Sequence, residues 1–293
     1  SINSKELKKN DIFFAIKGKN KNGNLFLSEA FKKGASLSIV NLKKKKLKQV
    51  RVEDTLEFLT KASSLLRDNV FSKIIAITGS CGKTSLKELV GKALNKISSA
   101  TYSKKSFNNK YGVPLSLFNL KKGDEFGIFE VGMDKKGEID YLSKIIKPNI
   151  GVITNISYAH AKNFKNIKQI ALAKSEIIKN IKNYGYLVLN GDDKFHNFHK
   201  KIAQKRKLTV YSFSMNKKNC ETSLDYIKKE DLRYKVSLKI KKSKKYFYFN
   251  SNNENDIKNL LGAVTIISIF KDIKKLNNNI FYDYQTPSGR GDI

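Results

Sequence analysis

The stretch Ile74–Thr84, with the sequence IIAITGSCGKT, is the most informative part of this chain. The apolar residues from Ile74 to Ile77 predict a buried strand, and Lys83 and Thr84 open a segment with helical spacing. Glycines between these elements let the backbone wrap closely around phosphates, and the free N–H groups at a helix start attract anions. The lysine can neutralise the outer phosphates, and the threonine hydroxyl can bind Mg²⁺. A strand, a glycine loop and a helix in this order predict an ATP site.

The loop is a shortened form of the general phosphate-binding pattern. That pattern has a glycine five residues before Gly82, where this chain has Ile77, so the match is to Gly-x-x-Gly-Lys-Thr. A chance Gly-Lys-Thr in an ordinary loop is the alternative, and the flanking strand and helix argue against it. The residues expected to contact the nucleotide are Thr78, Gly79, Ser80, Cys81, Gly82, Lys83 and Thr84.

Two α/β units are predicted along the 293 residues, in keeping with roughly 100–200 residues per domain. Residues 1–71 form the first, with strands at 11–16 and 36–40 and helices at 25–33 and 52–66. Residues 72–293 form the second. Its strands are predicted at 74–77, 126–131, 150–154 and 186–189, its helices at 83–96, 138–146, 167–181 and 256–270, and a hairpin at 236–249. Strands that alternate with helices predict a mostly parallel sheet with helices on both faces.

The net charge is extreme, because 58 Lys and Arg against 26 Asp and Glu give +32. One interpretation is a basic ATPase that binds nucleic acid, with arginine and aromatic side chains gathered on one face. The excess is instead almost all lysine and is spread along the whole chain. Arginine is the better reader of bases and phosphates, so this pattern favours a compositional bias. We expect no nucleic-acid partner.

The sequence shows no pattern typical of secretion or of a membrane span. Ser1 starts directly into polar sequence, without the apolar segment of a signal peptide. The longest apolar stretch, residues 260–270, is far shorter than the ~20 residues that cross a bilayer. Two cysteines, Cys81 and Cys220, are too few for a disulfide framework. We expect a cytoplasmic protein that works as a monomer.

Polar residues follow two of the predicted strands. Glu130 ends an apolar run, and a carboxylate at the carboxyl end of a parallel strand points into the ligand crevice, where it could hold Mg²⁺. His160 follows the strand 150–154, and its place near the same crevice favours a functional role over the structural role that a lone histidine more often has. His196 and His199 fall in a polar helical segment and are expected at the surface.

Together these residues resemble the Mur ligases, ATP-dependent enzymes that form amide bonds in peptidoglycan synthesis. The short phosphate loop is similar to the family's own variant, and the segment 154–160 resembles its Thr-Asn…His element. Lys174, which by itself looks like a surface lysine, lies in a segment that resembles the one carrying a carbamylated lysine. Further resemblances lie in Asn190-Gly191-Asp192-Asp193 and in Pro287 with Gly289-Arg290.

Two segments resemble those family members that add D-alanyl-D-alanine to UDP-N-acetylmuramoyl-tripeptide. They are 130–139, with Glu-x-Gly followed by Gly-Glu-Ile, and 106–114, SFNNKYGVP. Residues 3–18 resemble the start of the domain that holds the UDP end of this substrate. The resemblance implies a carbon–nitrogen ligase that makes an acyl phosphate with ATP. A family member with another acceptor, or folylpolyglutamate synthase, is the alternative, and Gly-Glu-Ile argues against both.

The resemblance also implies roles for single residues. Lys83 would hold the β- and γ-phosphates, Thr84 and Glu130 one Mg²⁺, and His160 with a carbamylated Lys174 a second Mg²⁺. Lys83, Glu130, His160 and Lys174 are thus the expected catalytic residues. Asn259 and Arg290 are expected near the nucleotide, and Ser4, Asn108, Asn109 and Asn155 at the other substrates.

This chain also departs from the family pattern. Asn3, Lys5 and Asn24 replace residues of the UDP-binding domain, and Asp256 stands where the family has an adenine-contacting asparagine. The family has a third, C-terminal α/β domain of about 150 residues, which does not occur in these 293 residues. We therefore expect a fragment that is inactive alone.

Overall fold

The chain forms two compact units in the computed structural model, which describes residues 1–18, 21–43, 47–158 and 163–285. The first unit is Ser1–Asn69 and the second starts at Val70, two residues before the predicted boundary. Among the described residues no helix is long and apolar enough to cross a membrane.

In residues 1–18, 21–43 and 47–69, the first unit is a small sheet with two α-helices. Its three strands are parallel and adjacent in the order β1 (Ile12–Phe14), β2 (Leu37–Val40) and β3 (Gln49–Arg51). The helices are α1 (Leu27–Lys32) and α2 (Thr55–Asp68). Asp54 begins α2, because its carboxylate accepts the N–H groups of Leu56 and Glu57 at 2.7 and 2.9 Å.

The second unit is built on one sheet in the order β12-β11-β10-β9-β8-β7-β4-β6-β5. The strands from β5 to β10 in this order pair in parallel, and β10, β11 and β12 pair antiparallel. Their bounds are β4 (Lys73–Thr78), β5 (Ala100–Tyr102), β6 (Phe126–Glu130), β7 (Ile150–Ile153), β8 (Tyr186–Asn190), β9 (Thr209–Ser214), β10 (Thr222–Glu230), β11 (Arg233–Ile240) and β12 (Ser243–Phe249). The strand that leads into the phosphate loop, β4, therefore lies inside the parallel part.

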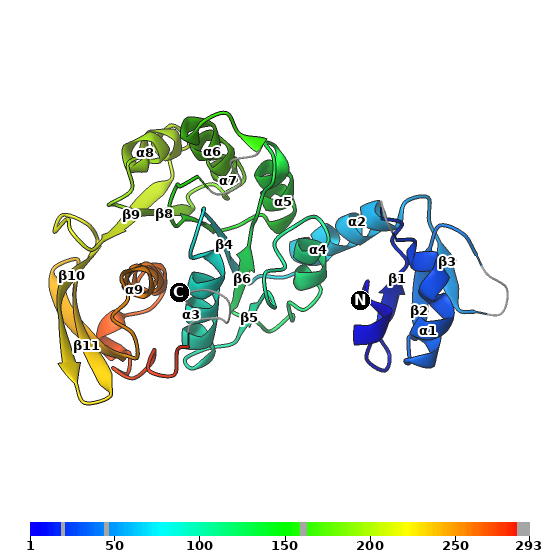
Figure 1. Cartoon of the computed structure of the whole chain (residues 1–293), viewed down its shortest axis with the longest axis horizontal. Coiled ribbons are helices and arrows are strands. Elements are labelled where there is room, and N and C mark those ends of the chain that lie inside the picture. The colour runs from blue at the N-terminus through cyan, green and yellow to red at the C-terminus, as the bar shows by residue number, and fades with distance from the viewer. Residues whose placement is uncertain (19–20, 44–46, 159–162, 286–293) are drawn as a thin grey trace. The chain divides into compact units, whose positions relative to one another are not determined.

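Helices cover both faces of this sheet, as predicted (Figure 1). They are α3 (Lys83–Asn95), α4 (Gly112–Leu117), α5 (Glu138–Ile146), α6 (Ile167–Lys174), α7 (Glu176–Lys179), α8 (His196–Lys205) and α9 (Glu254–Ile267). On one face α3 and α9 pack on Ile75 and Ile77 of β4 in a single hydrophobic core. From Leu260 to its end, α9 is buried on every side and carries almost only apolar residues.

The structure confirms the α/β fold class with a mostly parallel sheet, and it differs from the predicted elements at several points. The predicted helix 167–181 is broken at Ser175 into α6 and α7. The strands β3, β5, β9 and β10 and the helix α4 were not predicted. Three of these elements are short, since β3 and β5 have three residues each and α4 has six, and β9 and β10 carry no continuous apolar run. The predicted hairpin forms from β11 and β12, with its turn at Lys241 and Lys242, and it begins three residues earlier than predicted.

Candidate functional site

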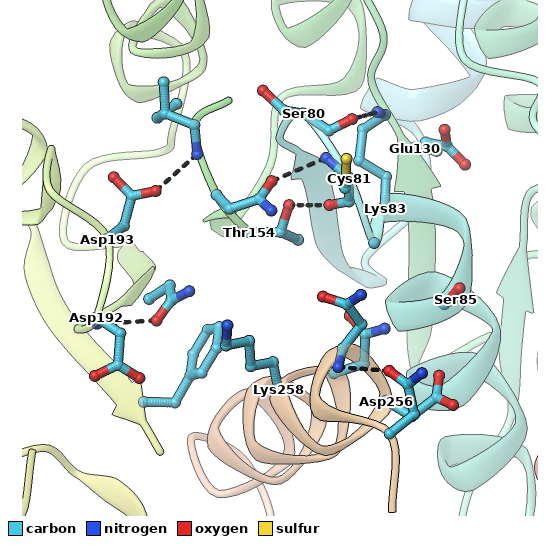
Figure 2. A pocket seen from close by; sticks show the side chains of 18 of the residues that line it. Ser80, Cys81, Lys83, Ser85, Glu130, Thr154, Asp192, Asp193, Asp256 and Lys258 are labelled. Carbon is cyan, nitrogen blue, oxygen red and sulfur yellow. Dashed lines mark hydrogen bonds between the residues drawn. The ribbon is translucent and has the colours of Figure 1, made fainter. Parts of the chain in front are cut away.

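A pocket of about 1180 Å³ opens where the parallel strands of the second unit end. Loops after β4, β5, β7 and β8, the last residue of β6 and the start of α9 line it. Figure 2 shows Ser80, Cys81 and Lys83 on one side, Asp192 and Asp193 on another, and Asp256 and Lys258 on α9. Carboxyl ends of parallel strands form the usual ligand crevice of such a sheet. The predicted phosphate loop therefore faces a cavity large enough for a nucleotide.

The loop is folded tightly against the end of β7. Gly79 has φ +146°, and a β-carbon added there would lie 1.8 Å from the Thr154 hydroxyl oxygen. That hydroxyl donates to the carbonyl oxygen of Cys81 at 2.6 Å. Only glycine allows this approach, which explains why the loop needs its first glycine.

Asn155 holds the same loop from the next position. Its carbonyl oxygen accepts the Ser80 N–H at 2.9 Å, and its side-chain oxygen accepts the Cys81 N–H at 2.8 Å. These two N–H groups are bound within the protein, so the phosphates would meet the N–H groups at the start of α3, which lack intrahelical acceptors. Contact between Asn155 and substrate stays a prediction.

Two lysines converge on one carbonyl oxygen behind the loop. Lys83 and Lys174 each donate their ammonium group to the Gly79 oxygen at 2.9 Å, and Lys83 also donates to Ser80 at 3.1 Å. Burial, and then the neighbouring Lys83 ammonium, lower the pKa of Lys174 from 10.5 to about 7. With only 1% of its surface exposed, Lys174 is not the surface lysine that its sequence context alone indicates.

Glu130 is fully buried at the end of β6 and faces the start of α3. One oxygen accepts the Thr84 hydroxyl at 2.6 Å, and the other accepts the Asn108 amide at 2.8 Å. A carboxylate beside a hydroxyl is a donor pair that suits Mg²⁺. No group of three or more His, Cys, Asp or Glu side chains among the described residues could hold a metal by itself. An ion here would take further oxygens from the nucleotide and water.

Glu176 ties the segment of Lys174 to the loop that follows Glu130. Its carboxylate accepts the N–H groups of Gly137 at 2.8 and 3.0 Å and of Asp140 at 3.1 Å, at the start of α5. Glu138 closes the same loop by accepting the Asp134 N–H at 2.6 Å. These contacts give the Gly-Glu-Ile segment a physical role in shaping the site.

The other side of the pocket comes from the turn after β8. Asp193 accepts the Ile156 N–H at 2.7 Å and so braces the segment that holds the phosphate loop. Asp192 accepts the Ser214 hydroxyl at 2.6 Å. On α9, Asn259 lies so close to Gly82 that a β-carbon there would be 2.9 Å from its side-chain oxygen. The predicted Asn259 is thus at the loop.

The remaining predicted residues lie elsewhere or are not described. His160 and Arg290 are outside the described residues. Ser4, in the first unit, donates to Glu29 at 3.1 Å. Asn109 accepts the N–H groups of Tyr111 and Gly112 at the start of α4. Thr78, at the end of β4, is fully buried.

The prediction that His199 lies at the surface is wrong. Its side chain is 2% exposed, and its ring Nε2 is 3.0 Å from the Ala171 oxygen of α6. Burial lowers its pKa. The polar segment 196–205 forms α8 with one buried side, a pattern that its many lysines concealed.

Sequence reasoning did not assign Asp192, Asp193, Lys194 or Lys258 to the site, yet all four line the pocket. The signal for the first three was their place directly after β8, at the same sheet edge as Glu130. Lys258 had no such signal. It lies on α9, which is distant in sequence from the strand ends that line the pocket with it.

Comparisons with known proteins agree in family and in fold. Residues 77–267 match the Mur ligase middle domain family. The UDP-N-acetylmuramoyl-tripeptide--D-alanyl-D-alanine ligase of Rickettsia prowazekii (strain Madrid E) is 34% identical over 100% of this chain and 66% of its own length. MurF from Acinetobacter baumannii is similar in structure, with TM-score 0.86, 26% identity, and coverage of 99% of this chain and 63% of that one.

MurF ligase from Thermotoga maritima, solved in complex with ADP, is also similar. Its TM-score is 0.84 at 25% identity, over 99% of this chain and 66% of that one. The chain thus spans about two thirds of the length of these relatives, and they resemble both of its units rather than the nucleotide pocket alone.

Proposed function

This chain belongs to the Mur ligase family, and we propose that it serves an ATP-dependent ligase that joins D-alanyl-D-alanine to UDP-N-acetylmuramoyl-tripeptide. The relatives with this name match along the chain, and a similar structure holds ADP. The observation that carries the proposal is the meeting of Lys83, Thr84 and Glu130 at one sheet edge, with the buried carboxylate 2.6 Å from the threonine hydroxyl.

The reaction is one that this arrangement can serve. The γ-phosphoryl group of ATP passes to the terminal carboxylate of the tripeptide, which leaves ADP and an acyl phosphate. The amine of D-alanyl-D-alanine then attacks the acyl carbon, an amide forms, and phosphate and a proton leave. Such transfers need positioning and charge neutralisation more than covalent help from the protein.

Each residue has a definite task in this scheme. Lys83 and the N–H groups at the start of α3 would bind the β- and γ-phosphates, because they carry positive charge toward the pocket. Thr84 and Glu130 would hold Mg²⁺, which shields the negative charge of the phosphates when bound. Asn108 keeps one Glu130 oxygen in place at 2.8 Å.

Phosphate release tests the proposal directly. The full-length gene product is given ATP with Mg²⁺, UDP-N-acetylmuramoyl-tripeptide and D-alanyl-D-alanine, and each substrate is left out in turn. We expect phosphate only when all are present. Phosphate release that does not depend on either substrate but is stimulated by DNA or RNA would instead support the nucleic-acid-binding ATPase. Binding of that nucleic acid should then weaken steeply as the salt concentration rises.

We also propose that Lys174 is carbamylated. The ammonium would first lose a proton, and the neutral amine would then add to CO₂ to give a carbamate and a second proton. The two steps together replace one of two converging positive charges by a negative one. The N–H that remains on the carbamate can still donate to the Gly79 carbonyl oxygen, which lies 2.9 Å from the Lys174 nitrogen. The carbamate oxygens are then hard ligands for the second Mg²⁺ site that the family resemblance implies.

This modification should depend on pH in a defined direction. The pKa of Lys174 is lowered to about 7, so the reactive neutral amine is present above that pH and is lost below it. Chain equilibrated with ¹³C-bicarbonate should show a carbamate ¹³C signal that grows between about pH 6 and pH 8, where ordinary lysines remain protonated. The signal should be missing in Lys174→Arg. A signal that persists in Lys174→Arg would show that another amine is the site.

A further inference from the structure

Helix α3 carries a second buried lysine, Lys87, one turn beyond Thr84. Its side chain is fully buried, and its ammonium lies 3.0 Å from the Glu88 carboxylate, which is 20% exposed. The same ammonium donates to the backbone oxygen of Lys105. A buried ammonium is costly even when it is paired, and an apolar side chain of similar volume would be cheaper here. Its contacts therefore indicate a task beyond packing.

Lys105, which receives this bond, has a strained backbone. It has φ +47°, in the left-handed region that residues with a β-carbon rarely occupy. Its own side chain is exposed, so it gains no core packing in return. Such a conformation persists only where surrounding contacts hold it. The bond from Lys87 is such a contact.

The segment that contains Lys105 reaches the pocket. It connects β5 to α4, and Ser106 and Asn108 line the pocket. The backbone oxygen of Asn108 accepts the Gly132 N–H at 2.8 Å. A β-carbon added to Gly132 would lie 2.8 Å from the Asn108 side chain, so the two segments pack tightly here. That side chain donates to Glu130 at 2.8 Å. The position of the Asn108 amide thus depends on the path of residues 103–108.

These contacts form a closed ring that starts and ends on α3. Thr84 donates to one Glu130 oxygen, Asn108 donates to the other, and Lys87 holds the segment of Asn108 through Lys105. We propose that Lys87 is a positioning residue, whose buried ammonium holds residues 103–108 in the strained path that sets Asn108 against Glu130. The role of Glu130 as a Mg²⁺ ligand rests on the proposed function, whereas the control of the segment by Lys87 does not.

The variant Lys87→Met tests this role, because methionine fills a similar volume without the ammonium. Lys92→Met is the matched control, since Lys92 lies on the same helix and is half-buried. Two measurements are made on the 293-residue chain. They are the hydrogen exchange of amides 103–109 without ligand, and the affinity for ADP with and without Mg²⁺ by calorimetry.

In Lys87→Met we expect the amides of residues 103–109 to exchange hydrogen at least about tenfold faster than in the unmodified chain. This is the effect of losing one charged hydrogen bond. The gain in ADP affinity on adding Mg²⁺ should fall about tenfold, and metal-free ADP affinity should stay within about twofold. Lys92→Met should change neither. A role in helix stability alone would instead weaken ADP binding equally with and without the metal.

Several results would overturn the inference. Unchanged exchange at 103–109 in Lys87→Met is one, and equal loss of ADP affinity in both conditions is another. If Lys87→Met does not fold, Lys105→Pro makes the same test from the segment, because proline cannot adopt a positive φ. We then expect the same loss of the Mg²⁺-dependent gain in ADP affinity. An equal loss of ADP affinity with and without Mg²⁺ would contradict the proposal. If the unmodified chain gains no ADP affinity from Mg²⁺, the proposed function fails, and the exchange data still decide the role of Lys87.

Discussion

Lys83→Met should weaken ATP binding by about 100-fold or more, because a buried charge that faces phosphate is removed without a substitute. Lys83 is 7% exposed, and its ammonium already lies on the loop, where it contacts the carbonyl oxygens of Gly79 and Ser80. Phosphate oxygens would replace these carbonyl contacts, and methionine offers no donor. Calorimetric titration of the chain with ATP and Mg²⁺ measures the loss.

A control and a second readout make this result specific. Lys92→Met, on the same helix, should bind ATP as the unmodified chain does. Because Lys83 lowers the pKa of Lys174, its removal should also let that pKa rise toward its ordinary value. The pH at which Lys174 takes up CO₂ should then move upward. An ATP affinity within about threefold of the unmodified chain would show that the loop does not bind the phosphates.

Gly79→Ala should cost about 3 kcal/mol of folding free energy and abolish nucleotide binding. Two effects add up at this position. The φ of +146° is strained for any residue with a β-carbon, and that carbon would lie 1.8 Å from the Thr154 hydroxyl oxygen. The loop can relieve the clash only by leaving Thr154, and with it the contact to Cys81. Urea unfolding and calorimetry measure the two losses.

Two companion variants test whether this steric argument is the correct one. Gly123→Ala is the matched control, because a β-carbon there meets nothing within 4 Å, so it should change stability by less than about 0.5 kcal/mol. Adding Thr154→Ala to Gly79→Ala removes the clashing oxygen and should restore part of the lost stability. If the double variant is less stable by the sum of the two single losses, the clash with Thr154 is not the cause.

The order of elements could be predicted well where apolar runs are strong. Strands β4, β6 and β7 are buried on both faces and therefore appear as continuous apolar segments. Helix α5 has the predicted bounds, since Pro148 lies just beyond its end. The strand β10 was missed, because its exposed lysines conceal the alternation that marks a half-buried strand.

Residue roles were predictable only in part. The phosphate loop and Glu130 could be found because the loop directly follows a recognisable strand and Glu130 ends another. Lys174 has no such local signal, and only the family resemblance singled it out. Its burial, like that of His199, comes from helices that pack against it, and a sequence rich in lysine hides which side of a helix is covered.

The sequence by itself determined the phosphate loop, because strand, glycines, lysine and helix start are contiguous and their geometry is local. Only the tertiary structure decided how that loop is held. The bonds from Thr84 to Glu130, from Lys174 to Gly79 and from Cys81 to Asn155 join residues that are 46, 95 and 74 positions apart. Such pairs meet because the parallel strands end at one edge of the sheet, and burial among packed helices sets their distances and the pKa of Lys174.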